Sequence, residues 1–168
     1  AESGAVNTVS DRNGEWFGDN TDVDGVRAAL TSVNFSATGK RVIVLGRGGA
    51  ARAAAVALKG VRSIEMLGRH DLHKAETQAC DLLVNATPVG MYPVIDRSPI
   101  DENSIPAGIV FDMVYNPPTT QLLRAAKAAG KTVVPGSTMF VAQAERQFEI
   151  WTGQRPASGL YTIEALTR

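Results

Sequence analysis

Residues 41–58 read RVIVLGRGGAARAAAVAL, and this stretch decides the fold. The run Arg41–Leu45 is short and apolar, as expected of a buried strand, and Ala50–Leu58 is an alanine-rich segment long enough for a helix. A glycine loop, Gly46–Gly49, separates the two. The order strand, glycine loop, helix is typical of the first unit of a parallel α/β sheet.

The rest of the chain continues this alternation and predicts a doubly wound parallel sheet. Further strands are predicted at Ser63–Leu67, Asp81–Asn85, Ile109–Met113 and Thr132–Val134, and a short apolar end at Ile163–Leu166. Helical patterns follow Asp22, span Thr120–Ala129 and span Met139–Trp151. Either Asp22 or Thr21 can cap the first of these helices. Within Ala5–Asp22, the polar turn Asp11–Gly14 is expected to close a hairpin.

The overall composition indicates a chain with a well-buried core. Of its 168 residues, 44% are hydrophobic and 20% charged, and the formal net charge is zero. Without a basic field, neither nucleic acid nor a membrane surface is an expected partner. Cys80 is the only cysteine, which excludes an internal disulfide and a cysteine-based metal site and fits a cytoplasmic protein. The first residues lack the features of a signal peptide.

The glycine loop has the spacing G-x-G-x-x-A at Gly46, Gly48 and Ala51. Gly46 can make the tight turn, Gly48 leaves room for a pyrophosphate, and Ala51 lets the helix pack close to the strand. The helix N-terminus, at Gly49 and Ala50, then presents N–H donors to the phosphates. The alternative is a glycine turn that only joins strand to helix. The strand and helix on either side favour dinucleotide binding.

The end of the second strand bears on the choice of cofactor. An acidic residue there would bind the ribose 2′-hydroxyl of NAD, but the chain reads Leu67, Gly68, Arg69, His70. Arg69 suits a 2′-phosphate, so the sequence favours NADP. Two alternatives stay open: Arg69 could simply extend into solvent, and Asp71 facing the ribose would reverse the preference.

Six ordered segments carry a resemblance to a known family. They are GAVNTV (Gly4–Val9), GDNTDVDGV (Gly18–Val26), LGRGGAARA (Leu45–Ala53), VNATPVGM (Val84–Met91), FDMVYNPP (Phe111–Pro118) and MFVAQAERQF (Met139–Phe148). Together they resemble shikimate dehydrogenases, over nearly the whole chain. The resemblance implies a Rossmann-like fold and reversible hydride transfer between NADP and 3-dehydroshikimate, a step in the biosynthesis of chorismate and the aromatic amino acids.

The resemblance also assigns residues to the site. The family's catalytic aspartate corresponds to Asp22, whose plain role would be a helix N-cap, while the family's catalytic lysine has no match. Substrate contacts are implied for Asn7, Asp22, Tyr115 and Gln143. Contacts with the nicotinamide and ribose are implied around Asn85, Thr87, Met91, Met113, Gly136 and Met139. Without the resemblance these would be turn, loop and core residues.

The first departure from the family is the near absence of its amino-terminal substrate domain. We expect residues 1–22 to be a remnant of that domain and a hinge, residues 23–137 to bind the dinucleotide, and residues 138–168 to pack back toward the missing part. An apolar seam is then expected to be exposed, with Phe148, Ile150 and Trp151 as candidates. Neither Lys40 nor Lys59 is expected to replace the missing lysine, so the chain alone is expected to be inactive.

Two further departures concern the second strand and the residues after it. The family's N-R-T-x-x-R signature is reduced to Arg69 within Gly68–His73, so His70, His73, Arg47 and Arg52 are candidates for additional positive charge. Only a few residues separate Ala75 from Asp81, where the family has a further helix, strand and loop. We expect sequence to have been lost there, by engineering or by omission of residues.

Alternatives to the NADP-dependent shikimate enzyme remain. A quinate/shikimate dehydrogenase using NAD differs mainly in cofactor and in one substrate hydroxyl. The isolated chain could also be a noncatalytic dinucleotide-binding module. The sequence leaves open whether the parent protein is a monomer or a homodimer, and whether it is bifunctional.

Overall fold

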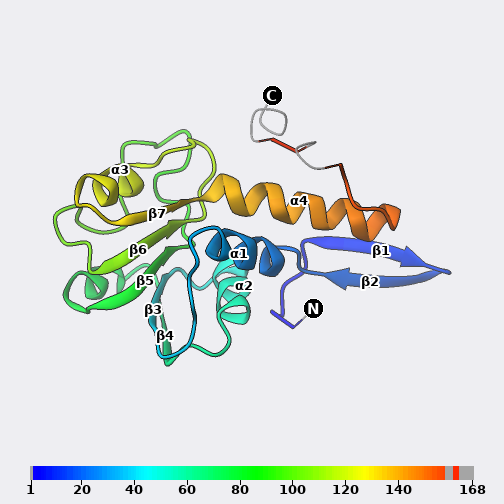
Figure 1. Cartoon of the computed structure of the whole chain (residues 1–168), viewed down its shortest axis with the longest axis horizontal. Coiled ribbons are helices and arrows are strands. Elements are labelled where there is room, and N and C mark those ends of the chain that lie inside the picture. The colour runs from blue at the N-terminus through cyan, green and yellow to red at the C-terminus, as the bar shows by residue number, and fades with distance from the viewer. Residues whose placement is uncertain (1, 158–160, 163–168) are drawn as a thin grey trace.

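A five-stranded parallel sheet forms the centre of the computed structural model, which describes residues 2–157, 161 and 162 (Figure 1). In spatial order the strands are β4 (Ser63–Leu67), β3 (Arg41–Leu45), β5 (Cys80–Asn85), β6 (Ala107–Asp112) and β7 (Thr132–Pro135). Every neighbouring pair is parallel. The carboxyl ends of all five strands therefore lie along one edge of the sheet.

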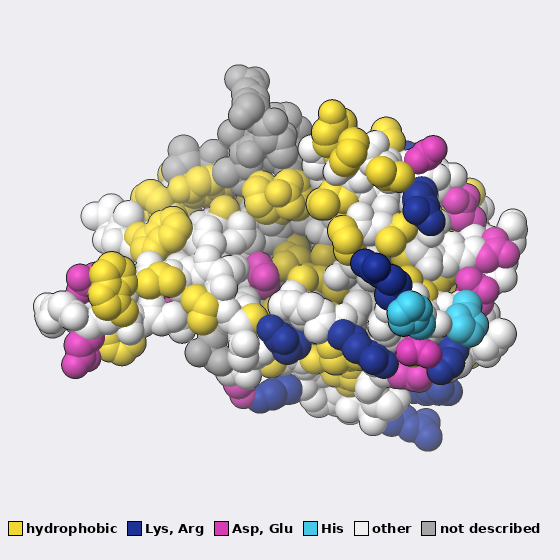
Figure 2. Space-filling model, turned by 180° about the vertical axis from the view of Figure 1, so that it is seen from behind, with side chains coloured by type: hydrophobic (Ala, Val, Ile, Leu, Met, Phe, Trp, Pro, Cys, Tyr) yellow, Lys and Arg dark blue, Asp and Glu magenta, His cyan; other side chains and the backbone are white. Residues whose placement is uncertain are grey.

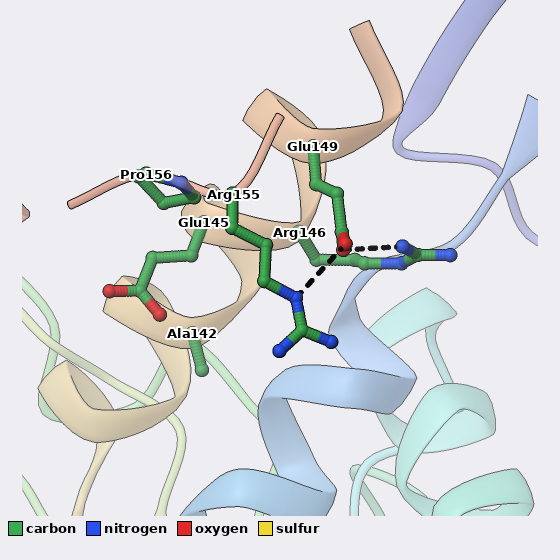
Figure 3. A pocket seen from close by; sticks show the side chains of 6 residues that line it. All are labelled: Ala142, Glu145, Arg146, Glu149, Arg155 and Pro156. Atoms are coloured by element: carbon green, nitrogen blue, oxygen red, sulfur yellow. Dashed lines mark hydrogen bonds and ion pairs between the residues drawn. The ribbon is translucent and has the colours of Figure 1, made fainter. Parts of the chain in front are cut away.

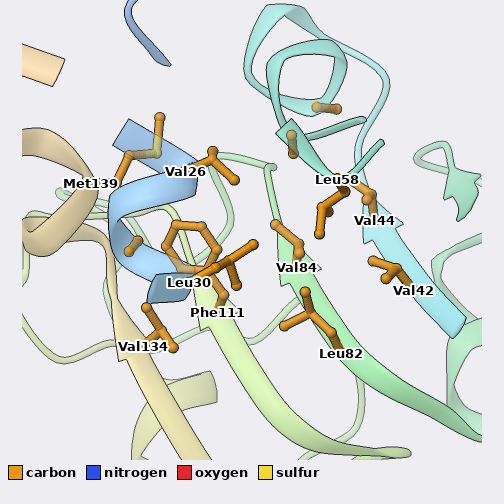
Figure 4. Packing of buried hydrophobic residues seen from close by; sticks show 13 residues of the cluster. Val26, Leu30, Val42, Val44, Leu58, Leu82, Val84, Phe111, Val134 and Met139 are labelled. Atoms are coloured by element: carbon orange, nitrogen blue, oxygen red, sulfur yellow. The ribbon is translucent and has the colours of Figure 1, made fainter. Parts of the chain in front are cut away.

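Helices cover both faces of the sheet, as predicted for a doubly wound fold. On one face lie α1 (Asp22–Thr31), α2 (Gly49–Ala57) and the start of α4 (Gly136–Thr152), packed around the cluster shown in Figure 4. On the other lie the 3₁₀ helix η1 (Leu72–Thr77) and α3 (Gln121–Ala128). Because successive strand side chains alternate between faces, a strand buried on both sides is apolar throughout.

The predicted hairpin is confirmed and projects from the sheet domain beside the far end of α4 (Figure 1). It consists of β1 (Thr8–Arg12) and β2 (Glu15–Asp19), joined through Asn13 and Gly14, whose φ angles of 58° and 86° suit a tight turn. The indole of Trp151, near the end of α4, donates a hydrogen bond of 3.0 Å to the Val9 carbonyl. The hairpin is thus attached to the end of α4.

Apolar side chains are exposed along this hairpin and at the end of α4, and Figure 2 shows hydrophobic surface on that side of the molecule. Trp16 is 76% exposed and Trp151 59%. Of the seam residues predicted, Trp151 is exposed, whereas Phe148 and Ile150 are half-buried. The predicted apolar end, Ile163–Leu166, lies outside the described residues.

The start of α1 selects Thr21 from the two predicted N-cap candidates, whereas the starts of α3 and α4 differ from the sequence-based predictions. Asp22 is the first residue of α1, so it is not the N-cap; Thr21 holds that position, but its side chain makes no capping hydrogen bond. Thr120 is the N-cap of α3, and its hydroxyl accepts a hydrogen bond from the Leu123 N–H. The last helix begins at Gly136, earlier than the predicted Met139, because Gly136 directly follows the extended residue Pro135.

The connection from β4 to β5 is short and well packed in the structure. It consists of η1 and a brief turn, and Ala75 of η1 is fully buried against the sheet. Cys80, the first residue of β5, is half-buried there, and this burial raises the pKa of its thiol to about 11. Among the described residues, no helix is long and apolar enough to cross a membrane, and no cluster of metal-binding side chains is found.

Candidate functional site

A cleft of about 330 Å³ lies where α1, α2 and α4 meet the segment after β6. It is lined by Asn7, Asp22, Ala50, Met113, Tyr115, Met139, Phe140, Gln143 and Gln147. The cleft therefore brings together all four predicted substrate residues and three predicted cofactor residues. In open α/β sheets, ligands bind in such a position, outside the carboxyl ends of the strands.

The polar wall of the cleft is a connected hydrogen-bond network. The Asn7 side-chain amide donates to Asp22 Oδ1 at 2.9 Å and to Thr21 Oγ1 at 3.1 Å, while Asn7 Oδ1 accepts from the Thr21 N–H at 2.9 Å. The Thr21 hydroxyl in turn donates to Gln143 Oε1 at 3.2 Å. Thr21 is fully buried. It thus links Asn7, the residue before β1, to Gln143 of α4. The backbone of Thr21 is helical, with φ −76° and ψ −10°, which does not suit a side-chain cap of α1.

The carboxylate of Asp22 is half-buried at the start of α1. Burial raises its pKa above the ordinary value, and the hydrogen bond from Asn7 partly opposes that rise. The described residues place no cation within ion-pair distance of Asp22. A carboxylate held this way can accept a hydrogen bond from a substrate hydroxyl and can take part in proton transfer.

An aromatic pair forms the other wall of the cleft. The rings of Tyr115 and Phe140 stack with centroids 4.0 Å apart and an interplanar angle of 9°. Stacking restricts the ring of Tyr115, whose side chain is 37% exposed. The sequence predicted Tyr115 but missed Phe140 and Gln147. Both lie within the MFVAQAERQF segment, and their spacing from Gln143 on the helix was the signal available for finding them.

The glycine loop lies beside the cleft and has the predicted geometry. Gly46 has a φ of 113°, and a side chain there would meet the Ala86 carbonyl oxygen at 2.8 Å, so glycine is required. A side chain at Gly48 would meet nothing within 4 Å. Ala51 is fully buried, as expected for close packing of helix on strand. The open space at Gly48 and the free first N–H groups of α2 suit a pyrophosphate.

Two predicted cofactor residues lie at the end of β5: Asn85 is the last residue of the strand, and Thr87 is in the turn that follows. Asn85 is fully buried, and its side-chain oxygen accepts hydrogen bonds from the Thr87 N–H at 3.0 Å and the Thr87 hydroxyl at 2.6 Å. Its amide nitrogen donates to the Asp112 carboxylate at 2.9 Å. Asn85 therefore holds the turn from within. Met91, on the same loop, is 44% exposed and does not line the cleft.

Gly136, another predicted cofactor residue, has a packing role at the start of α4. A side chain there would overlap the Val114 carbonyl oxygen and would meet the Met113 carbonyl at 2.6 Å. Only glycine allows α4 to begin this close to the segment after β6. Gly136 thereby brings Met139 and Phe140 to the cleft.

Charged side chains gather at the tip of β4. The Arg47 guanidinium donates to the Met66 carbonyl at 3.3 Å and lies 3.7 Å from Asp71, and the Lys74 ammonium lies 2.7 Å from Asp71. The hydrogen bond from Lys74 holds the pKa of Asp71 below its ordinary value. Arg69 is exposed. Figure 2 shows both histidines beside lysine and arginine side chains on the sheet domain.

A second cavity, of about 370 Å³, lies between α4 and the segment that follows it (Figure 3). Its wall holds Glu149, which accepts hydrogen bonds from Arg146 at 2.6 Å and from Arg155 at 3.3 Å. None of the predicted site residues lines this cavity. Its principal charges neutralise one another, so it is a weaker candidate for a site.

The two lysines not expected to be catalytic lie away from the cleft. Lys40 precedes β3, at the opposite end of the strands, and pairs with Asp81 at 3.0 Å. Lys59 follows α2 and pairs with Glu2. Among the described residues, the lining of the cleft includes no lysine.

A doubly wound sheet, a glycine loop leading into a helix, and a polar cleft beside them define a Rossmann-like dinucleotide-binding domain. A family model described as the shikimate 5′-dehydrogenase C-terminal domain matches residues 136–158. A shikimate dehydrogenase (NADP(+)) from Crocosphaera subtropica is 38% identical, over 97% of this chain and 67% of that protein. The chain belongs to the shikimate dehydrogenase family.

Solved structures agree with this assignment. A Thermus thermophilus shikimate 5-dehydrogenase, determined with NADP(H) and shikimate, is 36% identical, with a TM-score of 0.81 over 93% of this chain and 65% of that chain. A 5-ketofructose reductase of Gluconobacter sp. strain CHM43 is also 36% identical, with a TM-score of 0.79 over 98% of this chain and 68% of that chain.

The matches also differ from this chain in length. The chain spans 62% to 67% of the length of four curated shikimate dehydrogenases that it matches. The match with the Crocosphaera protein extends over 194 positions, more than the 168 residues of this chain, so that relative has residues within the matched region that are absent here. The expectation of lost sequence near Ala75–Asp81 stays a prediction.

Proposed function

We propose that this chain supplies the dinucleotide-binding part and one wall of the substrate site of an NADP-dependent enzyme that interconverts 3-dehydroshikimate and shikimate. The convergence of Asn7, Asp22, Tyr115 and Gln143 in one cleft carries the proposal. The first and last of these residues, Asn7 and Gln143, are more than a hundred residues apart in the sequence, and the four offer the hydroxyl- and carboxylate-binding groups that such a substrate needs.

The residues of the chain have defined tasks in this proposal. NADP, when bound, supplies or accepts the hydride at the carbon of the substrate carbonyl. Asp22 accepts a hydrogen bond from a substrate hydroxyl, and Asn7 fixes the direction of that carboxylate. Tyr115 orients the substrate from the opposite wall, and Gln143 orients it from the polar wall that it shares with Asp22. The proton on the reacting oxygen comes from a lysine that the cleft lining does not contain, so we expect the chain alone to be inactive.

The β4 tip supports NADP as the cofactor. Asp71, the carboxylate that could have bound a ribose hydroxyl, is already paired with Lys74 and Arg47. Arg69, which is exposed, and Arg47, whose contact with Asp71 is long at 3.7 Å, are planar cations able to bind a 2′-phosphate.

Calorimetric titration of the 168-residue chain with NADP⁺ and with NAD⁺ tests the cofactor. We expect tighter binding of NADP⁺ and a loss of about tenfold in NADP⁺ affinity in Arg69→Ala, from the loss of one charged contact. Equal affinity for both dinucleotides, or tighter binding of NAD⁺, would favour the NAD-dependent quinate/shikimate alternative.

A pair of glycine variants distinguishes a dinucleotide loop from a simple turn. In Gly48→Ala the added methyl group meets no protein atom within 4 Å, so the fold should be unaffected while the pyrophosphate loses its space. Gly108→Ala is the control. The nearest atom to the added methyl group would be 4.0 Å away, and Gly108 lies at the amino end of β6, away from the strand ends that border the cleft. If Gly48→Ala binds NADP⁺ as well as Gly108→Ala does, the loop is only a turn.

Activity assays on the natural polypeptide that contains this chain test the substrate. Reduction of NADP⁺ is expected with shikimate and not with quinate. The likeness to the 5-ketofructose reductase makes 5-ketofructose the informative competitor. Oxidation of NADPH with 5-ketofructose in preference to 3-dehydroshikimate would contradict the proposed substrate while leaving the cofactor assignment intact.

A further inference from the structure

Asp112 is a buried carboxylate and the last residue of β6. Met113 and Tyr115, within the three residues that follow it, line the cleft. The side chain of Asp112 is fully buried, and no ion pair is found for it among the described residues. It lies opposite Asn85 in the β5–β6 register. An anion buried at a strand end without a cation is costly unless hydrogen bonds replace its water.

Three hydrogen bonds from three separate segments converge on this carboxylate. Oδ1 accepts from the Asn85 amide at 2.9 Å and from the Val114 N–H at 3.0 Å, and Oδ2 accepts from the Thr120 hydroxyl at 2.6 Å. Asp112 thus connects the end of β5, and through Asn85 the turn after it, to the segment after β6 and the N-cap of α3. Burial raises its pKa to about 6, although these hydrogen bonds oppose the rise.

Two of the connected segments contact the proposed site. The turn after β5 places the Ala86 carbonyl against Gly46 of the glycine loop. The segment after β6 supplies Met113 and Tyr115 to the cleft, and its backbone abuts Gly136 at the start of α4. Asp112 itself does not line the cleft.

We propose that Asp112 is a positioning residue, whose carboxylate holds the turn after β5 and the segment after β6 in register with the glycine loop and so fixes the cofactor side of the cleft. This inference rests on the proposed dinucleotide site. It assigns Asn85 an indirect role, through Asp112 and Thr87, in place of a direct contact with the cofactor.

The test compares three variants of the 168-residue chain. Asp112→Ala removes all three hydrogen bonds, whereas Asp112→Asn keeps the shape and can keep the bonds, because the Thr120 hydroxyl can accept as well as donate. Val110→Ala is the matched control: it removes fully buried atoms from the same strand, and Val110 lies two residues before Asp112, on the same face of the sheet. NADP⁺ affinity and amide hydrogen exchange are measured for each.

We expect Asp112→Ala to lose about tenfold in NADP⁺ affinity and to exchange the amides of Thr87, Val89 and Val114 about tenfold faster. Asp112→Asn should recover both to within about threefold of the wild type. Val110→Ala should raise the amide exchange rates of the sheet in general, without a larger effect on the amides of Thr87, Val89 and Val114. If Asp112→Ala does not fold, Asp112→Ser replaces it, because a serine hydroxyl can reach the nearby Val114 N–H but is too short for Thr120.

Two results would overturn the inference. The first is that the amides of Thr87, Val89 and Val114 exchange no faster in Asp112→Ala than in Val110→Ala. The second is that these amides exchange faster in Asp112→Ala while its NADP⁺ affinity is unchanged, because the role of Asp112 would then be structural only. Failure of the wild-type chain to bind NADP⁺ would instead contradict the proposed function. Amide exchange would then still decide whether Asp112 holds the two segments.

Discussion

The side-chain amide of Asn7 donates a hydrogen bond of 2.9 Å to the carboxylate of Asp22, and this contact joins the hairpin to the first turn of α1. It is the hydrogen bond that opposes the effect of burial on Asp22. A residue from a different structural element therefore favours the ionised form of Asp22, which the proposed chemistry needs.

Asn7→Ala should raise the pKa of Asp22 further, because burial would act without the opposing hydrogen bond. Titration of the Asp22 carboxyl carbon by NMR measures this directly. Asn103→Ala, which alters an exposed loop asparagine, is the control and should leave that pKa unchanged. A pKa of Asp22 that stays constant or falls in Asn7→Ala would show that this hydrogen bond does not stabilise the carboxylate.

Arg47→Ala should weaken NADP⁺ binding by about tenfold and NAD⁺ binding by less than about twofold, since only NADP⁺ has a phosphate for this guanidinium. Arg47 lies across the β4 tip, 3.7 Å from Asp71. Arg62→Ala removes an exposed arginine next to the opposite end of the same strand and serves as the control. Equal losses for the two dinucleotides would show that Arg47 binds the shared pyrophosphate or only supports the loop.

Gly136→Ala should lower the free energy of unfolding by about 3 kcal/mol, because its methyl group would overlap rigid backbone. The two closest contacts are carbonyl groups of Val114 and Met113, which cannot move without displacing the segment that lines the cleft. Gly108→Ala, with open space around it, should change stability by less than about 0.5 kcal/mol. Urea denaturation compares the two, and similar stabilities would mean that α4 can shift to accommodate the methyl group.

The strands and the glycine loop could be predicted from sequence because their signals are local. Buried parallel strands are short apolar runs, and Gly46 is required by the backbone conformation of its own turn. Helix starts were less predictable because capping depends on tertiary contacts. Thr21 has the right chemistry for a cap, but its backbone is helical and its hydroxyl binds Gln143, which is 122 residues away in the sequence.

Asp112 shows which part of the site the sequence did not reveal. It lies inside the recognised FDMVYNPP segment, yet it looked like a polar residue ending an apolar strand. Its importance follows from donors that are distant in sequence, with Asn85 27 residues before it and Thr120 8 residues after it. Phe140 was missed for a similar reason, since only the folded chain stacks it on Tyr115.

The raised pKa of Asp112 makes a prediction about stability that has a definite sign. Its pKa rises from the ordinary 3.8 to about 6 in the folded chain, so between these values the folded state keeps a proton that the unfolded state has released. The stability gained from this proton is complete below the unfolded pKa and is lost as the pH rises through the folded pKa. Asparagine at this position does not titrate.

The free energy of unfolding of the wild type, minus that of Asp112→Asn, should therefore fall by about 2 kcal/mol between pH 4 and pH 7. All other titrating groups are common to the two proteins, so their contributions largely cancel in the difference. Urea denaturation of both proteins across this pH range gives the measurement. A difference that rises with pH would mean that the hydrogen bonds from Asn85, Val114 and Thr120 outweigh burial and lower the pKa. A constant difference would mean that the two effects cancel, because Asp112 would then bind its proton equally well in the folded and unfolded chain.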